Sequence, residues 1–258
     1  MYKVCVPSYK RPHILKQKTM KLLERLQNNL SEVDVIVETD EMAEEYRKHI
    51  GDEVNIIVSN TDGIKEKRNF VRDYYQNKTD VDYLICLDDD IDELLDYDKP
   101  ITRETFIDTV EKGFTLCEEK GFKLWGVSAF NNSYYLERNI STNLRYICGA
   151  FWGLIIDRDL PVLQTQFNHY EDFCFTCQHY LRDKGVLRFN WIALKTKYFN
   201  PDGGISDWYG GNENRRVAQK NDAKVFTELY PKMARVIEKK SGFDLRLNHR
   251  YGNKIAVC

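Results

Sequence analysis

Over residues 1–90 the apolar positions follow two spacings, and each spacing predicts a type of element. Short apolar runs at 4–6, 33–37, 54–58 and 83–87 are typical of buried strands. Apolar residues three and four positions apart predict helices over 14–30 and 64–75, with a short polar helix that ends at Gly51 between them. Strands that alternate with helices predict βαβ units, and therefore an α/β fold with a mainly parallel central sheet.

The second half of the chain continues the pattern. Helices are expected over 105–120 and 172–184, and strands over 124–130, 145–156 and 186–194. Residues 200–221 are rich in Gly, Asn and Asp and predict a long loop, followed by two helical segments separated near Pro231. We expect a core at 1–200, with a basic loop and C-terminal helices at 201–258 as part of the same domain.

Composition adds a charge asymmetry to this picture. The net charge of −2 divides into 24 Lys+Arg against 33 Asp+Glu over residues 1–187, and 14 against 7 over residues 188–258. A basic C-terminal segment suggests an anionic partner, although a solvated Lys-rich helix face explains it equally well. Seven irregularly spaced cysteines and no long apolar run favour a cytoplasmic protein without a membrane segment or an obligate protein partner.

Three consecutive carboxylates, Asp88, Asp89 and Asp90, follow the apolar run at 83–87. Like charges in a row repel one another, and burying them is costly without a counter-charge. A divalent cation at the carboxyl end of the strand would supply it, and hard oxygen ligands favour Mg²⁺ or Mn²⁺. The alternative is a solvated acidic turn.

Three other motifs follow predicted strands or begin predicted helices. Residues 7–9 and Glu38 end the first two strands, whose carboxyl ends share a sheet edge where a carboxylate can accept hydrogen bonds from a ribose or a base. Lys65 and Arg68 lie just past a helix N-terminus, which favours an anion such as a pyrophosphate, or else they form an exposed basic face. The acidic pair at 171–172 begins a helix, as an N-terminal cap or as a general base.

Taken in this order, and with the GAFWG run at 149–153, these motifs resemble a GT-A glycosyltransferase of the mostly inverting family-two type, over about residues 3–200. The resemblance implies a GT-A Rossmann-like sandwich, a hexosyl- or pentosyltransferase activity, a nucleotide-diphosphate sugar donor (a UDP-sugar) and Mn²⁺ or Mg²⁺. It implies donor contacts from Pro7, Ser8, Tyr9, Arg11, Glu38, Lys65, Arg68, Asp88, Asp89, Gly149 and Ala150.

The same resemblance implies that Asp90 and Asp88 hold the metal and that Asp172, beside Glu171, is the catalytic base. Many relatives add a histidine late in the chain as a metal or diphosphate ligand. Residues 197–204 contain none, which leaves Asn200 and Asp202 as candidates for the third ligand.

The opening PSYKRP and the run LDDDI most resemble phage glycosyltransferases that modify hydroxymethylated pyrimidines in DNA. This implies an acceptor such as hydroxymethylated or already glycosylated cytosine, contacted by Trp152, Trp208, Tyr209, Arg215 and Arg216. Three alternatives stay open: a glycan, lipid or protein acceptor, a sugar-1-phosphate nucleotidyltransferase, and a non-catalytic nucleotide- or DNA-binding module. Residues 7–12 contain no glycine, which argues against the nucleotidyltransferase.

Overall fold

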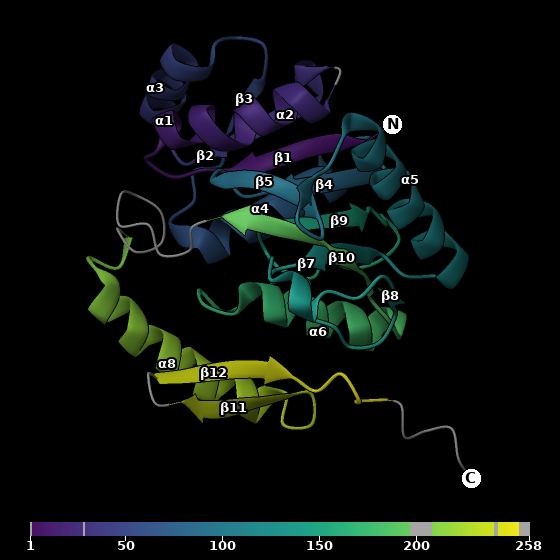
Figure 1. Cartoon of the computed structure of the whole chain (residues 1–258). Helices are drawn as coiled ribbons and strands as arrows, with labels where there is room; N and C mark the ends of the chain where they lie inside the picture. The colour runs from purple at the N-terminus through teal and green to yellow at the C-terminus, as the bar shows by residue number, and fades with distance from the viewer. Residues whose placement is uncertain (1, 28, 197–207, 240–241, 253–258) are drawn as a thin grey trace.

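The computed structural model describes residues 2–27, 29–196, 208–239 and 242–252 of the 258-residue chain. A large β-sheet lies at its centre, helices lie on both sides of the sheet, and a C-terminal helix and hairpin lie next to the helix at 171–183 (Figure 1). None of the helices described is long and apolar enough to cross a lipid bilayer.

The central sheet contains ten strands from the described part of the chain. These are β1 (Lys3–Pro7), β2 (Val33–Val37), β3 (Asn55–Val58), β4 (Tyr83–Leu87), β5 (Ile91–Asp96), β6 (Lys99–Pro100), β7 (Leu124–Ser128), β8 (Ile140–Ser141), β9 (Phe151–Ile155) and β10 (Leu187–Thr196). Their order is β3-β2-β1-β4-β9-β7-β10-β5-β6, and β8 pairs with β10.

The first four strands in sequence that were expected from the apolar runs are β1 to β4, and they pair with one another in parallel. β10 and β7 also pair in parallel, whereas β9 runs antiparallel to both β4 and β7, and β5 runs antiparallel to β10. The predicted α/β fold with a large, mainly parallel sheet is confirmed, and β9 and β5 add antiparallel pairings that the apolar pattern does not reveal.

The helices are α1 (Pro12–Leu15), the π-turn η1 (Lys16–Met20), α2 (Lys21–Leu26), the short η2 (Leu30–Glu32), α3 (Asp40–Ile50), α4 (Gly63–Asn77), α5 (Arg103–Lys120), the short η3 (Ser133–Tyr135), α6 (Glu171–Asp183) and α8 (Asn212–Leu229). α5 shows the local signals most fully. The Thr102 hydroxyl accepts a hydrogen bond from the backbone N–H of Thr105 at its start, and Gly121 ends it at φ 70°. Gly51 ends α3 at φ 74°, as its position in the sequence predicts.

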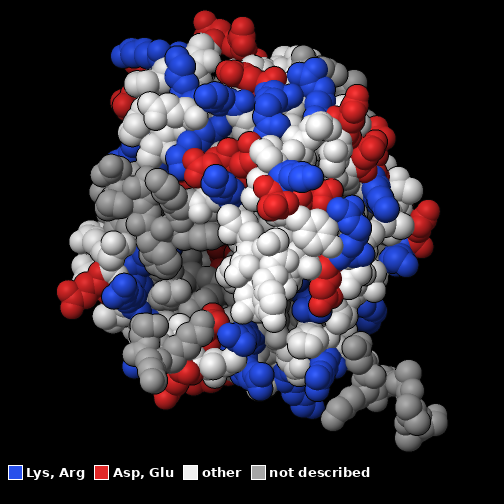
Figure 2. Space-filling view, in the orientation of Figure 1, with Lys and Arg blue, Asp and Glu red and all other residues white. Residues whose placement is uncertain are grey.

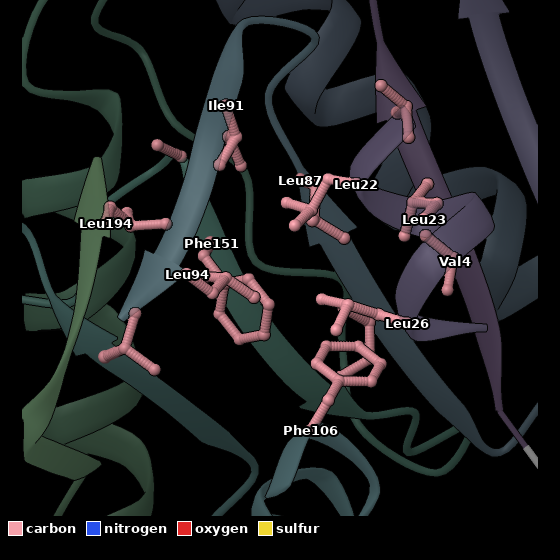
Figure 3. Close-up of a cluster of buried hydrophobic side chains, with 14 of the residues drawn as sticks. Val4, Leu22, Leu23, Leu26, Leu87, Ile91, Leu94, Phe106, Phe151 and Leu194 are labelled. Carbon is pink, nitrogen blue, oxygen red and sulfur yellow. The ribbon is translucent and has the colours of Figure 1, made fainter. Parts of the chain in front are cut away.

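Alternating side chains of the strands point to opposite faces of the sheet, and each face carries its own apolar cluster. Val4 and Val6 of β1 pack with α2, α3 and α5, whereas Cys5 between them packs with α4 and α6. Figure 3 shows the first cluster, in which leucines of α2 meet strand side chains and Phe106 of α5. Each fully buried Leu or Phe contributes about 1.5–3 kcal/mol to the stability of the fold. The two apolar layers therefore stabilise the sheet whose edge carries the polar motifs.

The end of the chain differs from the prediction. After α8, residues predicted to be a second helix form the antiparallel hairpin of β11 (Ala234–Lys239) and β12 (Gly242–Leu247), with Val236 opposite Leu245. The helical prediction there is wrong, and the sequence of β12, in which Phe243, Leu245 and Leu247 alternate with Asp244 and Arg246, has the period of a strand. The loop predicted for 200–221 is too long, since α8 begins at Asn212. The part at 197–207 lies outside the described residues.

Two further predictions need correction. The strand predicted over 145–156 is β9 alone, and residues 145–150 are a buried irregular segment. In that segment, side chains rather than a neighbouring strand satisfy the backbone: Ile147 N–H bonds to the Thr176 hydroxyl at 3.2 Å, and Gly149 N–H bonds to Asp172 at 3.0 Å. The helix predicted over 14–30 is also shorter, because α2 ends at Leu26.

Candidate active site

A cleft of about 450 Å³ opens at the carboxyl ends of β1 and β4. Its wall is built from these strand ends, the start of α4, the segment before β9, the start of α6, and the C-terminal α8 and β12. Residues that lie far apart in the sequence therefore face one space, as expected for the ends of parallel strands. Around the molecule's face seen in Figure 2, acidic and basic side chains lie next to one another and border an uncharged area near the centre.

The acidic triplet lies in the turn between β4 and β5, and each carboxylate has an arginine partner. Asp88 pairs with Arg68. Asp89 is 1% exposed and pairs with both ends of the Arg11 guanidinium, with a further hydrogen bond from Ser8. The Arg11 Nη1 atom also lies 3.3 Å from Asp90 Oδ2. The counter-charge that the sequence analysis assigned to a cation is thus supplied in part by the protein itself.

The metal prediction was tested against this arrangement. Among the described residues, no group of three or more His, Cys, Asp and Glu side chains is arranged to hold a metal ion. Mg²⁺, however, is usually bound through one or two carboxylates together with substrate phosphates and waters. Asp88 fits that role because its side chain is 34% exposed and lines the cleft.

Asp90 is placed less directly. It is not among the described residues that line the cleft, and Thr196 donates a 3.1 Å hydrogen bond to its Oδ1. Burial and the neighbouring Asp88 carboxylate raise the pKa of Asp90 to about 6, while Arg11 acts in the opposite direction. Asn200 and Asp202, the candidates for a third ligand, lie outside the described residues.

Arg68 connects the triplet to the second acidic pair. Its side chain is 2% exposed and donates to Asp88, to the Gly149 carbonyl at 2.9 Å and to the Cys86 sulfur at 2.9 Å. Its Nε lies 3.4 Å from Glu171 Oε1. A buried guanidinium needs such partners, because an unpaired buried charge is costly. Arg68 thereby fixes Asp88 and Glu171 on either side of itself.

The pair at the start of α6 has two different environments. Glu171 also lies 3.4 Å from Arg72, and burial raises its pKa to about 7 although Arg68 and Arg72 oppose the shift. Asp172 Oδ2 accepts hydrogen bonds from the Tyr146 hydroxyl and from Gly149 N–H. Burial raises the pKa of Asp172, and these donors act against that shift. Both residues line the cleft.

Most of the predicted donor residues meet here. Besides the acidic residues and Arg68, the cleft lining includes Pro7, Ser8, Tyr9, Arg11, Glu38, Gly149 and Ala150. Lys65 is the exception: it pairs with Glu66 and is not among the described lining residues.

Lys67, rather than the predicted Lys65, is the lysine of α4 that lines the cleft. It is 2% exposed, donates to the Ser8 carbonyl at 2.8 Å and pairs with Glu38 at 3.1 Å. Burial lowers the pKa of Lys67, and Glu38 opposes that shift. The signal for it was the spacing: Gly63, Lys67, Val71 and Tyr75 form one buried stripe of α4 at intervals of four residues.

The predicted acceptor residues separate into two groups. Trp208 and Arg215 line the cleft, and Trp208 Nε1 donates to Asp62 at 2.6 Å. Tyr209 stacks on His169, a cleft residue, with ring centroids 4.8 Å apart. Arg216 is exposed and is not among the described lining residues.

Trp152 is a correction. It is 2% exposed and packs against Phe175 in the core on the α4 and α6 side of the sheet, so it does not reach the cleft. Its position in β9 turns it away from the face that the neighbouring Phe151 occupies.

Several lining residues were missed by the sequence analysis, namely Phe130, Tyr146, His169, Gln219, Phe243 and Leu245. Gln219, Phe243 and Leu245 reach the cleft only through the tertiary fold, because α8 and β12 pack against α6 through a third apolar cluster. No local pattern in the sequence marks them.

No protein-family model and no curated protein matches the chain. Among solved structures, it is similar to a mannosyltransferase from Pyrobaculum calidifontis in complex with GDP-Man and Mn²⁺, at 10% identity and a TM-score of 0.56. That similarity covers 89% of this chain and 64% of the other, so the chain spans less than two thirds of the mannosyltransferase.

A second similar structure is glucosyl-3-phosphoglycerate synthase from Mycobacterium tuberculosis, in complex with Mn²⁺, UDP and glucosyl-3-phosphoglycerate. Identity is 10%, the TM-score is 0.50, and 96% of this chain and 87% of the other are covered. At these identities the similarity shows the fold alone, which is a GT-A Rossmann-like fold.

Proposed function

We propose that the protein is a metal-dependent glycosyltransferase that moves a sugar from a nucleotide-diphosphate sugar, a UDP-sugar, to an acceptor hydroxyl. The observation that carries the proposal is the convergence of Asp88, Arg68, Glu171 and Asp172 on one cleft at the carboxyl ends of the strands. The GT-A fold and the Mn²⁺ complexes of the two similar structures support it.

On the donor side, the ends of β1 and β2 suit a nucleoside. Glu38 and the Ser8 segment are fixed by Lys67, and a carboxylate in such a place accepts hydrogen bonds from hydroxyl or amino groups of the nucleoside. Asp88, with Asp90 beside it, would hold Mn²⁺ or Mg²⁺ together with donor phosphates. When bound, the cation neutralises charge on the departing diphosphate.

On the acceptor side, Asp172 is the proposed base. Tyr146 and the Gly149 backbone fix the orientation of its carboxylate at the cleft wall. In the proposed step the acceptor oxygen forms a bond to the anomeric carbon while its proton passes to Asp172. The bond from that carbon to the diphosphate oxygen breaks, and the diphosphate leaves with the electron pair. Attack from the face opposite the diphosphate gives inversion.

For the acceptor we propose hydroxymethylated or already glycosylated cytosine in DNA. Arg215 at the cleft and the net charge of +7 over residues 188–258 (14 against 7) favour a polyanion. The aromatic rings of Trp208 and Phe130 at the cleft favour a flat base that has been turned out of its stack.

One experiment separates this proposal from its rivals. The protein is mixed with Mn²⁺, a panel of UDP- and GDP-sugars, and four acceptors: DNA with 5-hydroxymethylcytosine, unmodified DNA, a glycan and a protein. A glycosyltransferase releases nucleoside diphosphate and labels one acceptor. In a parallel reaction with UTP and glucose 1-phosphate, a sugar-1-phosphate nucleotidyltransferase instead releases pyrophosphate, and a binding module releases neither product. Transfer to the glycan or the protein alone would disprove the DNA acceptor but leave the transferase in place.

A further inference from the structure

His169 is the buried imidazole of the cleft. It lies two residues before α6, is 5% exposed and lines the cleft that contains Asp172. None of the roles proposed above uses it, although it stands two residues before the acidic pair in the sequence.

Asp222 of α8 fixes the orientation of this ring. One of its carboxylate oxygens, Oδ2, accepts a 3.0 Å hydrogen bond from the His169 backbone N–H and lies 3.3 Å from His169 Nδ1. Tyr209 stacks on the ring at an interplanar angle of 23°, and its hydroxyl lies 3.4 Å from the same Nδ1. Backbone, carboxylate and stack together leave the imidazole little freedom to turn.

The other ring nitrogen is different. Among the residues that the structure describes, His169 Nε2 has no hydrogen-bond partner, although it is buried. A carboxylate only accepts hydrogen bonds, so the proton of a neutral imidazole lies on Nδ1, facing Asp222, and Nε2 carries a lone pair. Buried polar atoms without a partner are uncommon in folded proteins and call for an explanation, and this one belongs to a residue that lines the cleft.

We propose that His169, held by Asp222, is a positioning residue of the acceptor site: its Nε2 accepts a hydrogen bond from a hydroxyl or amino group of the acceptor. The inference rests on the proposed function and deepens it, because it gives the C-terminal helix a part in acceptor recognition. Asp172 lies three residues further along the same wall, so a group held by His169 is close to the proposed base. No covalent step passes through the imidazole.

The test compares two substitutions at position 169. His169→Phe keeps a flat ring for the Tyr209 stack but removes the acceptor atom, whereas His169→Gln keeps an amide oxygen near the position of Nε2. With the 5-hydroxymethylcytosine oligonucleotide as acceptor, His169→Phe is expected to raise the acceptor KM about 10-fold, and His169→Gln about 2-fold, the range for one hydrogen bond. The donor KM is expected to change in neither variant.

A second variant keeps the histidine. Asp222→Asn removes the carboxylate charge. When its amide N–H faces Nδ1, it gives up the bond to the His169 backbone N–H and moves the ring proton to Nε2, which turns that atom into a donor. It is expected to raise the acceptor KM about as much as His169→Phe, on the order of 10-fold. Glu228→Gln, an exposed carboxylate of the same helix, is the matched control and is expected to match the wild type.

The outcomes separate the inference from the proposed function. Equal acceptor KM values in wild type, His169→Phe and Asp222→Asn would overturn the inference. So would equal rises in the donor and acceptor KM values, since they would indicate a structural role. If the wild type released no nucleotide from any donor, the proposed function would fall. In that case the Kd of the same oligonucleotide tests the inference on its own. A Kd about 10-fold weaker in Asp222→Asn but not in Glu228→Gln supports the inference, and equal Kd values refute it.

Discussion

At the scale of single residues, three cations of the cleft wall are wholly or largely buried and each has a carboxylate partner. Lys67 pairs with Glu38, Arg11 with Asp89, and Arg68 with Asp88. Removing one member of such a buried pair leaves an uncompensated charge, which typically costs about 3–5 kcal/mol. Substitutions that keep the shape of the side chain are therefore the informative ones.

Asp172→Asn is such a substitution. The amide can still accept hydrogen bonds from Tyr146 and Gly149 through its oxygen, but it cannot take a proton from the acceptor. We expect the donor Kd to stay unchanged and turnover to fall about 10²- to 10⁴-fold, the usual contribution of a general base. The measurement is nucleoside diphosphate release under saturating donor. Wild-type turnover in the variant would remove the base assignment.

His179 lies outside the cleft and controls acid stability instead. Burial lowers its pKa to about 4, although Asp183, 2.9 Å away, acts in the opposite direction. The folded-state pKa of His179 lies below the ordinary value of 6.5. His179 therefore contributes to the unfolding free energy above pH 6.5, and this contribution is lost as the pH falls towards 4. The shift corresponds to about 3 kcal/mol.

We therefore expect wild type to lose more unfolding free energy than His179→Gln between pH 7.5 and pH 4.5. Urea denaturation at both pH values measures the difference. Burial raises the pKa values of Asp90 and Glu171, so these two residues change the unfolding free energy with pH in the opposite direction. Both proteins contain them, so the comparison cancels their contribution. Parallel losses in both proteins would show that His179 does not titrate as described.

At the scale of elements, local patterns predicted those strands and helices whose apolar spacing agrees with the way they pack. The helix α5 was predictable because its apolar spacing and Gly121 agree with its packing. The segment before β9 was not, because its apolar run reads as strand while its backbone bonds to Thr176 and Asp172 of α6. In the site, strand ends were predictable from sheet geometry. The pairing of His169 with Asp222 was not, because 53 residues separate them and no spacing rule connects them.

β9 itself depends on one close contact. A Cβ at Gly153 would overlap the indole ring of Trp125, and Trp125 is fully buried among Phe114, Phe151 and Phe189. Gly153→Ala is expected to destabilise the protein by about 1–3 kcal/mol through overpacking. Trp125→Phe makes room, so the double variant is expected to lose less stability than the sum of the single variants. Additive losses in thermal denaturation would contradict the contact.

At the scale of the whole molecule, the C-terminal helix and hairpin complete the cleft and are attached to the sheet through α6. The third apolar cluster makes this attachment, with Phe226 of α8 fully buried next to Phe167, Tyr170, Phe173 and Tyr230. The proposed acceptor wall therefore depends on packing outside the cleft.

Phe226→Ala is expected to lower the unfolding free energy by about 3–5 kcal/mol and to raise the acceptor KM, because Asp222 lies one turn earlier on α8. Val225→Ala, at a neighbouring position that is 45% exposed, is the control and is expected to change stability by less than about 0.5 kcal/mol. Equal stability of the two variants in urea denaturation would show that this cluster does not fix α8.

The arginine partners of the acidic turn have a consequence for chelation. Since Arg11 and Arg68 already compensate the carboxylates, the turn does not require a dissolved ion to keep its shape. EDTA is therefore expected to stop sugar transfer while leaving the melting temperature unchanged. A melting temperature that falls with EDTA and recovers with Mn²⁺ would mean that the guanidinium groups are insufficient. If the melting temperature stays unchanged, metal dependence is a property of turnover alone, and purified protein stored without divalent ions should regain full activity as soon as they are added.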